Sequence, residues 1–285
     1  MKCNFKRHAL CAFPAAFIAF AIEILLIVTT ATAAADTGES GADIVGFVPR
    51  LLTAVSDRNA QCTECKLGDA VADAIRIYLN SDVTIICGGD LVRNLPPGEV
   101  TIDELKDLFL EDRILATTRI TPRELRDIME AGLGHIVLNK MEKIDEKISE
   151  YEGFPQISGF TVLYDASQAP GERIRDIMID GISIDLQDDT SFVTLASTLF
   201  MLNGGYGLPK MGTEAVSNMT MSDAMARYVN DGMSEYLTTG HRIIPAGNQS
   251  GTLVSTVPTG FISAVAAVYL LANSWRYKRK YNFER

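Results

Sequence analysis

Two long apolar runs, one near each end, place the strongest constraint on how this 285-residue chain can fold. The first run, 9–28, follows a short basic leader and precedes the small-residue triplet 31–33, which is the pattern of a cleaved secretory signal. Its length and the acidic Glu23 within it leave an uncleaved anchor as the alternative. Residues 1–35 are therefore predicted to be a signal peptide or anchor.

The second apolar run, 257–275, contains no charged residue, ends in Trp275 and is followed at once by the basic stretch 276–285. A bilayer-spanning length, an interfacial aromatic residue and flanking positive charge are typical of one transmembrane helix. A buried C-terminal helix is the alternative. We expect a single-pass type I protein of the plasma membrane or another secretory-pathway membrane, with a basic cytoplasmic tail and residues 36–256 as its outer or lumenal ectodomain.

The region 36–256 is long enough for one domain with its own hydrophobic core. The whole chain has a formal net charge of −10, and this middle region is more acidic still because both ends are basic. Such a charge repels polynucleotides, so a nucleic-acid partner is excluded. Two glycosylation triplets, at Asn218 and Asn248, fit a glycoprotein with a lumenal face.

Hydrophobic spacing and capping signals predict an α+β domain. Apolar residues recur at helical intervals over 67–79, and a last amphipathic helix is predicted at 221–237. Capping boxes begin two more helices, at 101–110 and 121–133. Buried strands are predicted at 82–87, 113–120, 160–164, 174–179 and 192–195. Because no regular βαβ rhythm connects these elements, we expect a mixed sheet packed with helices.

Cysteine and histidine usage argues against a metal centre. In a secreted domain, the spacing of Cys62 and Cys65 predicts a small-loop disulfide, with Cys87 buried or paired elsewhere. Structural zinc needs four ligands, and one C-x-x-C pair supplies two. The three histidines of the chain are scattered, so we predict no metal site, no cofactor and no catalytic residue in this chain.

Two glycine-rich loops each carry an aromatic residue. Phe200 precedes Asn203, Gly204 and Gly205, and Phe154 begins a second loop that is rich in proline and glycine. Glycine lets the backbone turn sharply and approach a ligand closely. Two facing aromatic rings could hold a flat base between them. The alternative is that both phenylalanines are core residues beneath turns.

Several motifs, in order, resemble the C-terminal domain of the 5′-nucleotidase family. They are L-G-D-A-V-A-D-A at 67–74, G-G at 88–89, L-P-P-G-E-V-T at 95–101, F-P-Q-I-S-G at 154–159 and the loop at 200–207. The likeness covers roughly residues 58–237. It implies the substrate-binding half of a two-domain hydrolase, in which Phe154 and Phe200 sandwich a nucleobase. It also implies that the half holding two divalent metals is missing from this chain.

The chain departs from that family's pattern at its anion-binding positions. Cys87 and Val92 stand where the family has asparagine and arginine, and Arg93 comes one residue late. Gln61 replaces another expected arginine, and Tyr206 replaces the acid that would hold the sugar hydroxyls. Losing an arginine removes charge-assisted hydrogen bonds of roughly 1.5 to 3 kcal/mol each. We therefore expect weak phosphate binding with the aromatic pair retained.

These observations leave three functional hypotheses. The first is a membrane-anchored domain that binds a nucleotide or nucleoside and serves nucleotide catabolism only beside a separate metallophosphatase chain. The second is a fragment of a full 5′-nucleotidase, and the third is a structural or adhesive surface protein that kept the fold and lost the site. For the first, the predicted substrate-binding residues are Phe154, Phe200, Asn203, Gly204, Gly205 and Arg93.

Overall fold

The computed structural model describes residues 43–55, 59–233 and 241–246. The chain divides into the unit Met1–Ile44, of which only Asp43 and Ile44 are described, and the unit Val45–Arg285, which contains the fold. The predicted signal segment, the apolar run 257–275 and the basic tail lie outside the described residues. Within the described ranges, no helix is both long enough and apolar enough to cross a bilayer.

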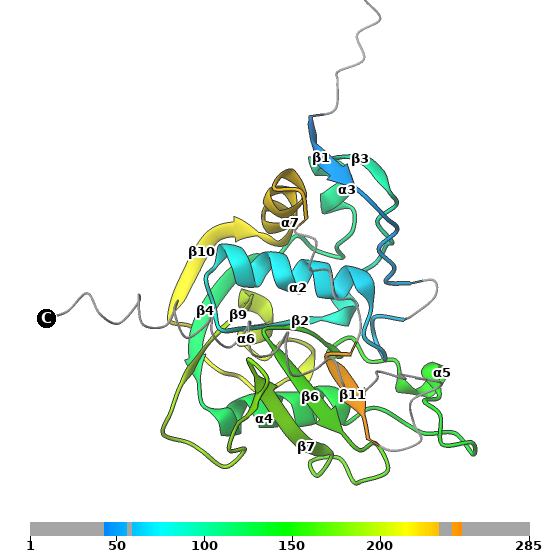
Figure 1. The fold of residues 1–285 in the computed structure, drawn as a ribbon, viewed down its shortest axis with the longest axis vertical. Coiled ribbons are helices and arrows are strands. Elements are labelled where there is room, and N and C mark those ends of the chain that lie inside the picture. The colour runs from blue at the N-terminus through cyan, green and yellow to red at the C-terminus, as the bar shows by residue number, and fades with distance from the viewer. Residues whose placement is uncertain (1–42, 56–58, 234–240, 247–285) are drawn as a thin grey trace, which may run out of the picture. The chain divides into compact units, whose positions relative to one another are not determined.

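Helices and strands are interspersed without a regular order along the described part of the chain (Figure 1). The helices are α2 (Lys66–Tyr78), α3 (Ile102–Lys106), α4 (Pro122–Leu133), α5 (Glu146–Ser149), α6 (Leu199–Leu202) and α7 (Met221–Asn230), with 3-10 turns η1 (Gly88–Asp90) and η2 (Gly205–Gly207). The strands are β1 (Ile44–Val48), β2 (Val83–Cys87), β3 (Gly98–Thr101), β4 (Ile114–Ile120), β5 (Pro155–Ser158), β6 (Phe160–Tyr164), β7 (Ile174–Ile179), β8 (Ile182–Ser183), β9 (Val193–Thr198), β10 (Ala215–Thr220) and β11 (Ile243–Pro245).

The sheets mix parallel and antiparallel pairs, as the sequence predicted. Within the described residues, the five-stranded central sheet has the order β10-β4-β9-β2-β5, and a four-stranded sheet has the order β11-β6-β7-β8. In the central sheet β2 is parallel to β9 and antiparallel to β5. In the other sheet β11 is parallel to β6, which is antiparallel to β7. The prediction of an α+β fold with mixed sheets is therefore confirmed.

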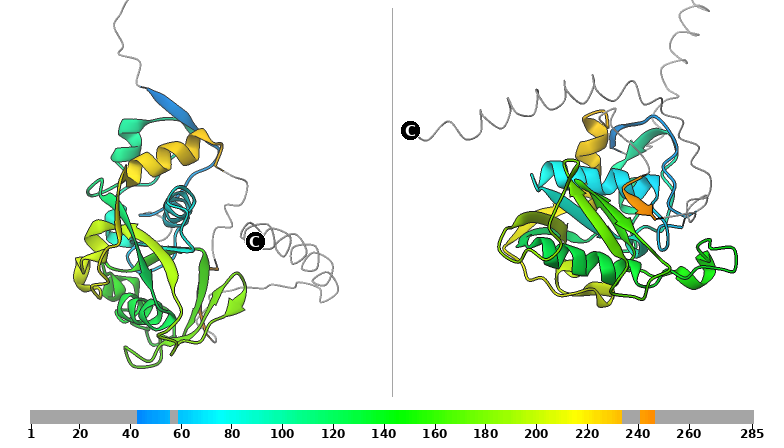
Figure 2. Two further views of the ribbon diagram at one scale, coloured as in Figure 1. Left: turned by 90° about the vertical axis from the view of Figure 1, so that its left-hand side faces the viewer. Right: turned by 60° about the horizontal axis from the view of Figure 1, so that its bottom comes forward.

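The central sheet separates two hydrophobic cores, because successive strand residues point to opposite faces. Ile86 of β2 packs into the core that contains α2 and α7. Its neighbours Ile85 and Cys87 pack into the core that contains α4, β6 and β7. The views in Figures 1 and 2 place α2 and α4 on opposite sides of this sheet. The central sheet is therefore packed on both of its faces.

The predicted capping boxes are present, and they fix where two helices begin. Thr101 accepts a hydrogen bond from the backbone of Glu104 at the start of α3, and Thr121 does the same with Glu124 at the start of α4. Helix α3 ends at Lys106, earlier than the predicted residue 110. Helix α7 ends at Asn230, before the predicted residue 237, while residues 234–240 lie outside the described ranges.

The predicted disulfide between Cys62 and Cys65 is wrong, because both are free, buried thiols, as is Cys87. The Cys65 sulfur instead caps α2 by accepting a hydrogen bond from the Gly68 backbone N–H at 3.3 Å. The Cys62 sulfur donates to the Asn59 carbonyl at 3.7 Å. Burial raises the pKa of Cys62 and of Cys65 to about 12, so both stay protonated at neutral pH.

Candidate functional site

The glycine-rich loop after β9 brings its backbone directly against an aromatic ring. Gly204 has φ of 88°, in the left-handed region that glycine adopts without strain. A Cβ atom at Gly205 would lie 2.3 Å from a carbon of the Phe200 ring, so no other residue fits there without moving the ring. Asn203 is the C-cap of α6, and its side-chain amide donates to the Leu199 carbonyl at 2.9 Å. The loop thus fixes the position of Phe200.

One face of the half-buried Phe200 ring is covered by a cation. The guanidinium carbon of Arg113 lies 3.7 Å from the ring centroid, and Tyr206 meets the ring edge-on with centroids 5.0 Å apart. Arg113 immediately precedes β4, which pairs antiparallel with β9 through Leu115 and Thr198. That pairing brings Arg113 beside the loop, far from Phe200 in sequence.

A buried carboxylate, Asp90, completes this cluster. It lies in the turn η1 after β2, is 0% exposed, and accepts hydrogen bonds on Oδ1 from Arg113 Nε and the Tyr206 hydroxyl, each at 2.9 Å. Among the described residues, Asp90 Oδ2 has no hydrogen-bond partner. Burial raises the pKa of Asp90, and the opposing effect of the bonds from Arg113 and Tyr206 is smaller. Arg113 also bonds to the exposed Glu111 at 2.8 Å.

Phe154 lies in a different environment from Phe200. It is 2% exposed and packs in the core on the α4 side of the sheet. The aromatic residue of that segment that touches the Phe200 loop is Tyr151, whose hydroxyl donates to the Tyr206 carbonyl at 2.6 Å. Tyr151 also stacks on His135, with centroids 3.8 Å apart. The placement of Phe154 is that of a core residue, which was the alternative interpretation of both phenylalanines.

The sequence-predicted Arg93 points elsewhere. Its side chain is 65% exposed and pairs with Asp107 at 3.3 Å. Cys87 is fully buried, and Val92 is exposed. The backbone carbonyl of Gln61 accepts a hydrogen bond from the Tyr151 backbone N–H at 3.0 Å. The structure therefore brings together Phe200, Gly204 and Gly205 with Asp90, Arg113 and Tyr206, whereas Phe154 and Arg93 lie outside this group.

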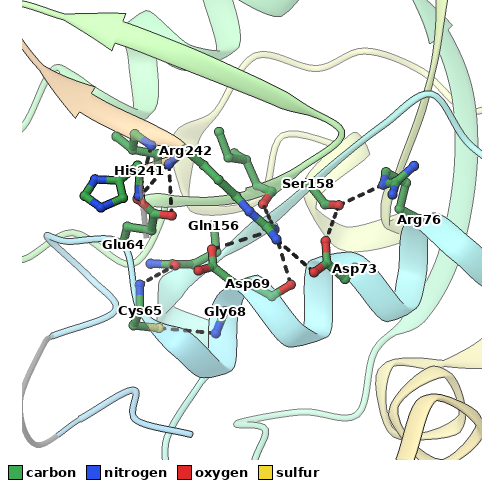
Figure 3. Close-up of polar contacts among 12 residues, drawn as sticks. Glu64, Cys65, Gly68, Asp69, Asp73, Arg76, Gln156, Ser158, His241 and Arg242 are labelled. Carbon is green, nitrogen blue, oxygen red and sulfur yellow. Dashed lines mark hydrogen bonds and ion pairs between the residues drawn. The ribbon is translucent and has the colours of Figure 1, made fainter. Parts of the chain in front are cut away.

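A second polar cluster, which the sequence did not reveal, surrounds Arg242 (Figure 3). The Arg242 guanidinium pairs with Asp73 of α2 at 2.8 Å and donates to the Ile157 carbonyl at 2.7 Å. The Glu64 carboxylate accepts from the backbone N–H groups of residues 241–243. These bonds attach the short strand β11 to the rest of the fold.

Further side chains extend the Arg242 cluster along α2. Ser158 donates to Asp73 Oδ1 and accepts from Arg76 Nε at 2.8 Å. Burial alone lowers the pKa of Arg242, but the hydrogen bond and charge of Asp73 raise it overall. Asp69 and Asp73 are four residues apart and share one side of α2, opposite the apolar Leu67, and this spacing was the available sequence signal. Within the described residues, no group of three or more His, Cys, Asp or Glu side chains could hold a metal ion.

Comparisons with known proteins identify the fold. A family model described as "5′-nucleotidase, C-terminal domain" matches residues 43–213. A comparison with curated proteins found no match. Among solved structures, a 5′-nucleotidase precursor from Thermus thermophilus superposes with a TM-score of 0.59 at 17% identity, covering 79% of this chain and 43% of that chain.

Two further structures share the fold. An NAD nucleotidase from Haemophilus influenzae gives a TM-score of 0.55 at 15% identity, covering 81% of this chain and 40% of that one. A sulfate thiohydrolase, also from Thermus thermophilus, gives a TM-score of 0.54 at 16% identity, covering 82% of this chain and 40% of that one. The chain thus spans less than half the length of each of these structures. Because one of them is named for a substrate other than a nucleotide, the shared fold does not fix the ligand.

Proposed function

Because the chain belongs to the 5′-nucleotidase C-terminal domain family, we propose that it is a membrane-anchored, non-catalytic domain that binds a nucleoside or nucleotide at the Phe200 loop. The observation that carries this proposal is the Arg113 guanidinium lying 3.7 Å from the centre of the Phe200 ring. A guanidinium is flat and delocalised, so a flat nucleobase could take its place on the same face.

The stacking surface is assigned to Phe200 rather than to a pair of phenylalanines. Its ring is half-buried and held by the close approach of Gly205, whereas Phe154 lies within the core. Stacking of a base on an aromatic ring is worth about 1–3 kcal/mol, and it tolerates different bases. Asn203 is exposed on the same loop, and because its side-chain nitrogen is bonded to the Leu199 carbonyl, its side-chain oxygen is the atom offered to a ligand.

Hydrolysis is assigned to a separate metallophosphatase chain. The family match covers the C-terminal domain alone, and the described residues lack a cluster that could hold a metal ion. Activating water and clamping phosphoryl oxygens in a two-metal site requires several such ligands. The proposal therefore links this chain to nucleotide catabolism only through a partner.

A binding titration tests the ligand assignment. The purified full-length chain in detergent is titrated by calorimetry with adenosine, AMP and a UDP-sugar, with and without divalent cations. We expect saturable binding, and we expect Phe200→Leu to abolish it. Phe192→Leu is the matched control, because Phe192 also lies beside an arginine, Arg119, at 5.4 Å, but precedes β9 rather than following it. Equal binding by both variants would contradict the role of Phe200.

Membrane anchoring is tested independently of ligand binding. The run 257–275 and the basic tail support a transmembrane anchor. Full-length protein should remain in the pellet after alkaline carbonate extraction of membranes, whereas a chain ending at Thr256 should be released. Release of the full-length chain would refute the anchor without affecting the ligand proposal.

A second function, that of a surface scaffold without a ligand, is favoured by a different observation. Asp90, Arg113 and Tyr206 bond to one another across the face where a ligand would lie. If the well-folded protein binds none of the tested ligands, the fold serves as a scaffold and these contacts stabilise it.

A further inference from the structure

We infer that the Phe200 site is selective for an uncharged nucleoside whose base has a guanine-type donor edge. This inference rests on the proposed function and narrows its ligand class. It takes the guanidinium of Arg113 as a template for the ligand, since that group covers one face of the Phe200 ring and also donates a hydrogen bond to the Asp90 carboxylate.

The template defines what a replacing group must offer. Arg113 lies over Phe200 while its Nε donates to Asp90 Oδ1 at 2.9 Å. A ligand that displaces it must therefore be flat and must present N–H donors to a carboxylate. Guanine carries an N1–H and a 2-amino group side by side in the ring plane, matching the paired oxygens of a carboxylate as an arginine fork does. Adenine places an acceptor nitrogen beside its amino group and would meet Asp90 with a lone pair.

The unused oxygen of Asp90 strengthens this argument. Asp90 is 0% exposed, and within the described residues its Oδ2 has no hydrogen-bond partner. Buried polar atoms without partners are uncommon and unfavourable. Arg113 and Tyr206 both donate to Oδ1, so the resident contacts leave Oδ2 unsatisfied. A two-donor base edge would satisfy both oxygens at once.

Arg113 has an alternative partner once it leaves the ring. Its Nη1 already bonds to Glu111 Oε2 at 2.8 Å, and Glu111 is exposed. Rotation of the Arg113 side chain toward Glu111 keeps its charge paired and hydrated. The Tyr206 hydroxyl can remain on Asp90 Oδ1 during this exchange. Displacement therefore leaves Arg113 paired with Glu111, while Asp90 exchanges its ion pair with Arg113 for hydrogen bonds from Tyr206 and the incoming neutral base.

The same charges disfavour a phosphate group. An anionic nucleotide would bring its charge toward the Asp90 carboxylate, and like charges in a low-dielectric site repel. Arg113 is shared between Asp90 and Glu111, and the exposed Arg93 lies outside this group of residues, beside Asp107. A neutral nucleoside is therefore favoured over its monophosphate.

Calorimetric titration of the wild-type full-length chain with five ligands tests the inference. The ligands are guanosine, inosine, 1-methylguanosine, adenosine and GMP. We expect guanosine to bind about tenfold more tightly than adenosine or 1-methylguanosine, whose N1–H is absent or blocked. Inosine keeps N1–H but lacks the 2-amino group, so it should fall between them. GMP should bind more weakly than guanosine.

Two variants connect the preference to Asp90. Asp90→Asn should reduce the guanosine preference to within about twofold, because an amide offers one acceptor instead of two. Asp103→Asn is the matched control, since Asp103 is exposed and pairs with Lys106 away from the site. If Asp90→Asn fails to fold, the comparison of guanosine with 1-methylguanosine on the wild-type chain decides whether the N1–H donor is recognised. Equal affinities for these two ligands would overturn the inference.

The outcomes separate this inference from the proposed function. Equal or tighter binding of adenosine overturns the inference and leaves the nucleoside-binding proposal standing. Tighter binding of GMP than of guanosine overturns the preference for an uncharged ligand. Absence of binding by every nucleoside to a well-folded chain refutes the proposed function and, with it, the inference.

Discussion

Replacing Arg242 by methionine tests whether β11 is held by the buried charge cluster. Methionine keeps most of the aliphatic stem but removes the guanidinium that pairs with Asp73 at 2.8 Å. The side chains are 13% and 10% exposed, so Asp73 would lose its charged partner in a largely water-free environment. Removing one member of a buried pair costs about 3–5 kcal/mol. Slight solvent access places our expectation for Arg242→Met at the lower end, about 3 kcal/mol.

The assay is urea unfolding of the purified protein followed by far-ultraviolet circular dichroism, with the free energy of unfolding taken from linear extrapolation. Arg119→Met is the matched control. Arg119 pairs with Glu214 at the same distance, 2.8 Å, but the two side chains are 60% and 48% exposed. An exposed pair contributes at most about 1 kcal/mol.

A double-mutant cycle isolates the pair itself. Asp73→Asn removes the carboxylate charge that Arg242→Met leaves without its partner. The double variant should therefore be more stable than the sum of the single effects predicts. Two results would refute the reasoning: a loss in Arg242→Met no larger than in Arg119→Met, or additive effects of Arg242→Met and Asp73→Asn.

Three further predictions follow from burial, capping and proton linkage. At pH 8, native protein should resist alkylation at its described cysteines, because burial raises the pKa of each thiol, and labelling should rise on unfolding; peptide mapping after iodoacetamide treatment measures this at Cys62, Cys65 and Cys87. Thr121→Ala should lower the free energy of unfolding by about 1 kcal/mol through loss of the α4 cap, as measured by urea unfolding; an unchanged midpoint would contradict this role. The pKa of Asp90 is raised from 3.8 in the folded state, so the folded chain binds more protons above that pH. The contribution of Asp90 to stability should therefore rise as pH falls from 7 toward 4, and Asp90→Asn should remove this part of the pH dependence; an identical pH dependence in both proteins would contradict it.

Local signals in the sequence predicted where helices α3 and α4 begin. The start of α4 follows from Thr121, Pro122 and Glu124, which act on one another within a single turn. The strand β6 occupies the predicted range 160–164, since its apolar pattern needs only a buried face to pack against. Elements whose residues lie close in sequence need no knowledge of the tertiary fold.

The candidate site depended on contacts that sequence spacing does not encode. Phe154 beside glycine and proline fits either a clamp or a core position. Pairing of Cys87 with Pro155 in adjacent strands draws that segment into the sheet, next to buried side chains. The bond from Arg113 to Asp90 spans 23 residues, and that from Arg242 to Asp73 spans 169. No periodic pattern predicts contacts of that kind.

The disulfide prediction failed for a related reason. A C-x-x-C spacing in a secreted domain favours a bridge, but helix α2 begins directly after the second cysteine, whose sulfur caps it. Spacing alone could not show that Cys62 forms a contact of its own with the Asn59 carbonyl.

The division of the central sheet into two cores has a consequence for how this chain can evolve. Ile86 and Ile85 are neighbours in the chain, yet they pack in different cores. A substitution in one core therefore needs compensating substitutions in that core alone, and the residues of the other core can change independently. Two small packing problems are easier to solve by successive single mutations than one large problem. This independence helps explain how relatives with 15–17% identity preserve the same architecture.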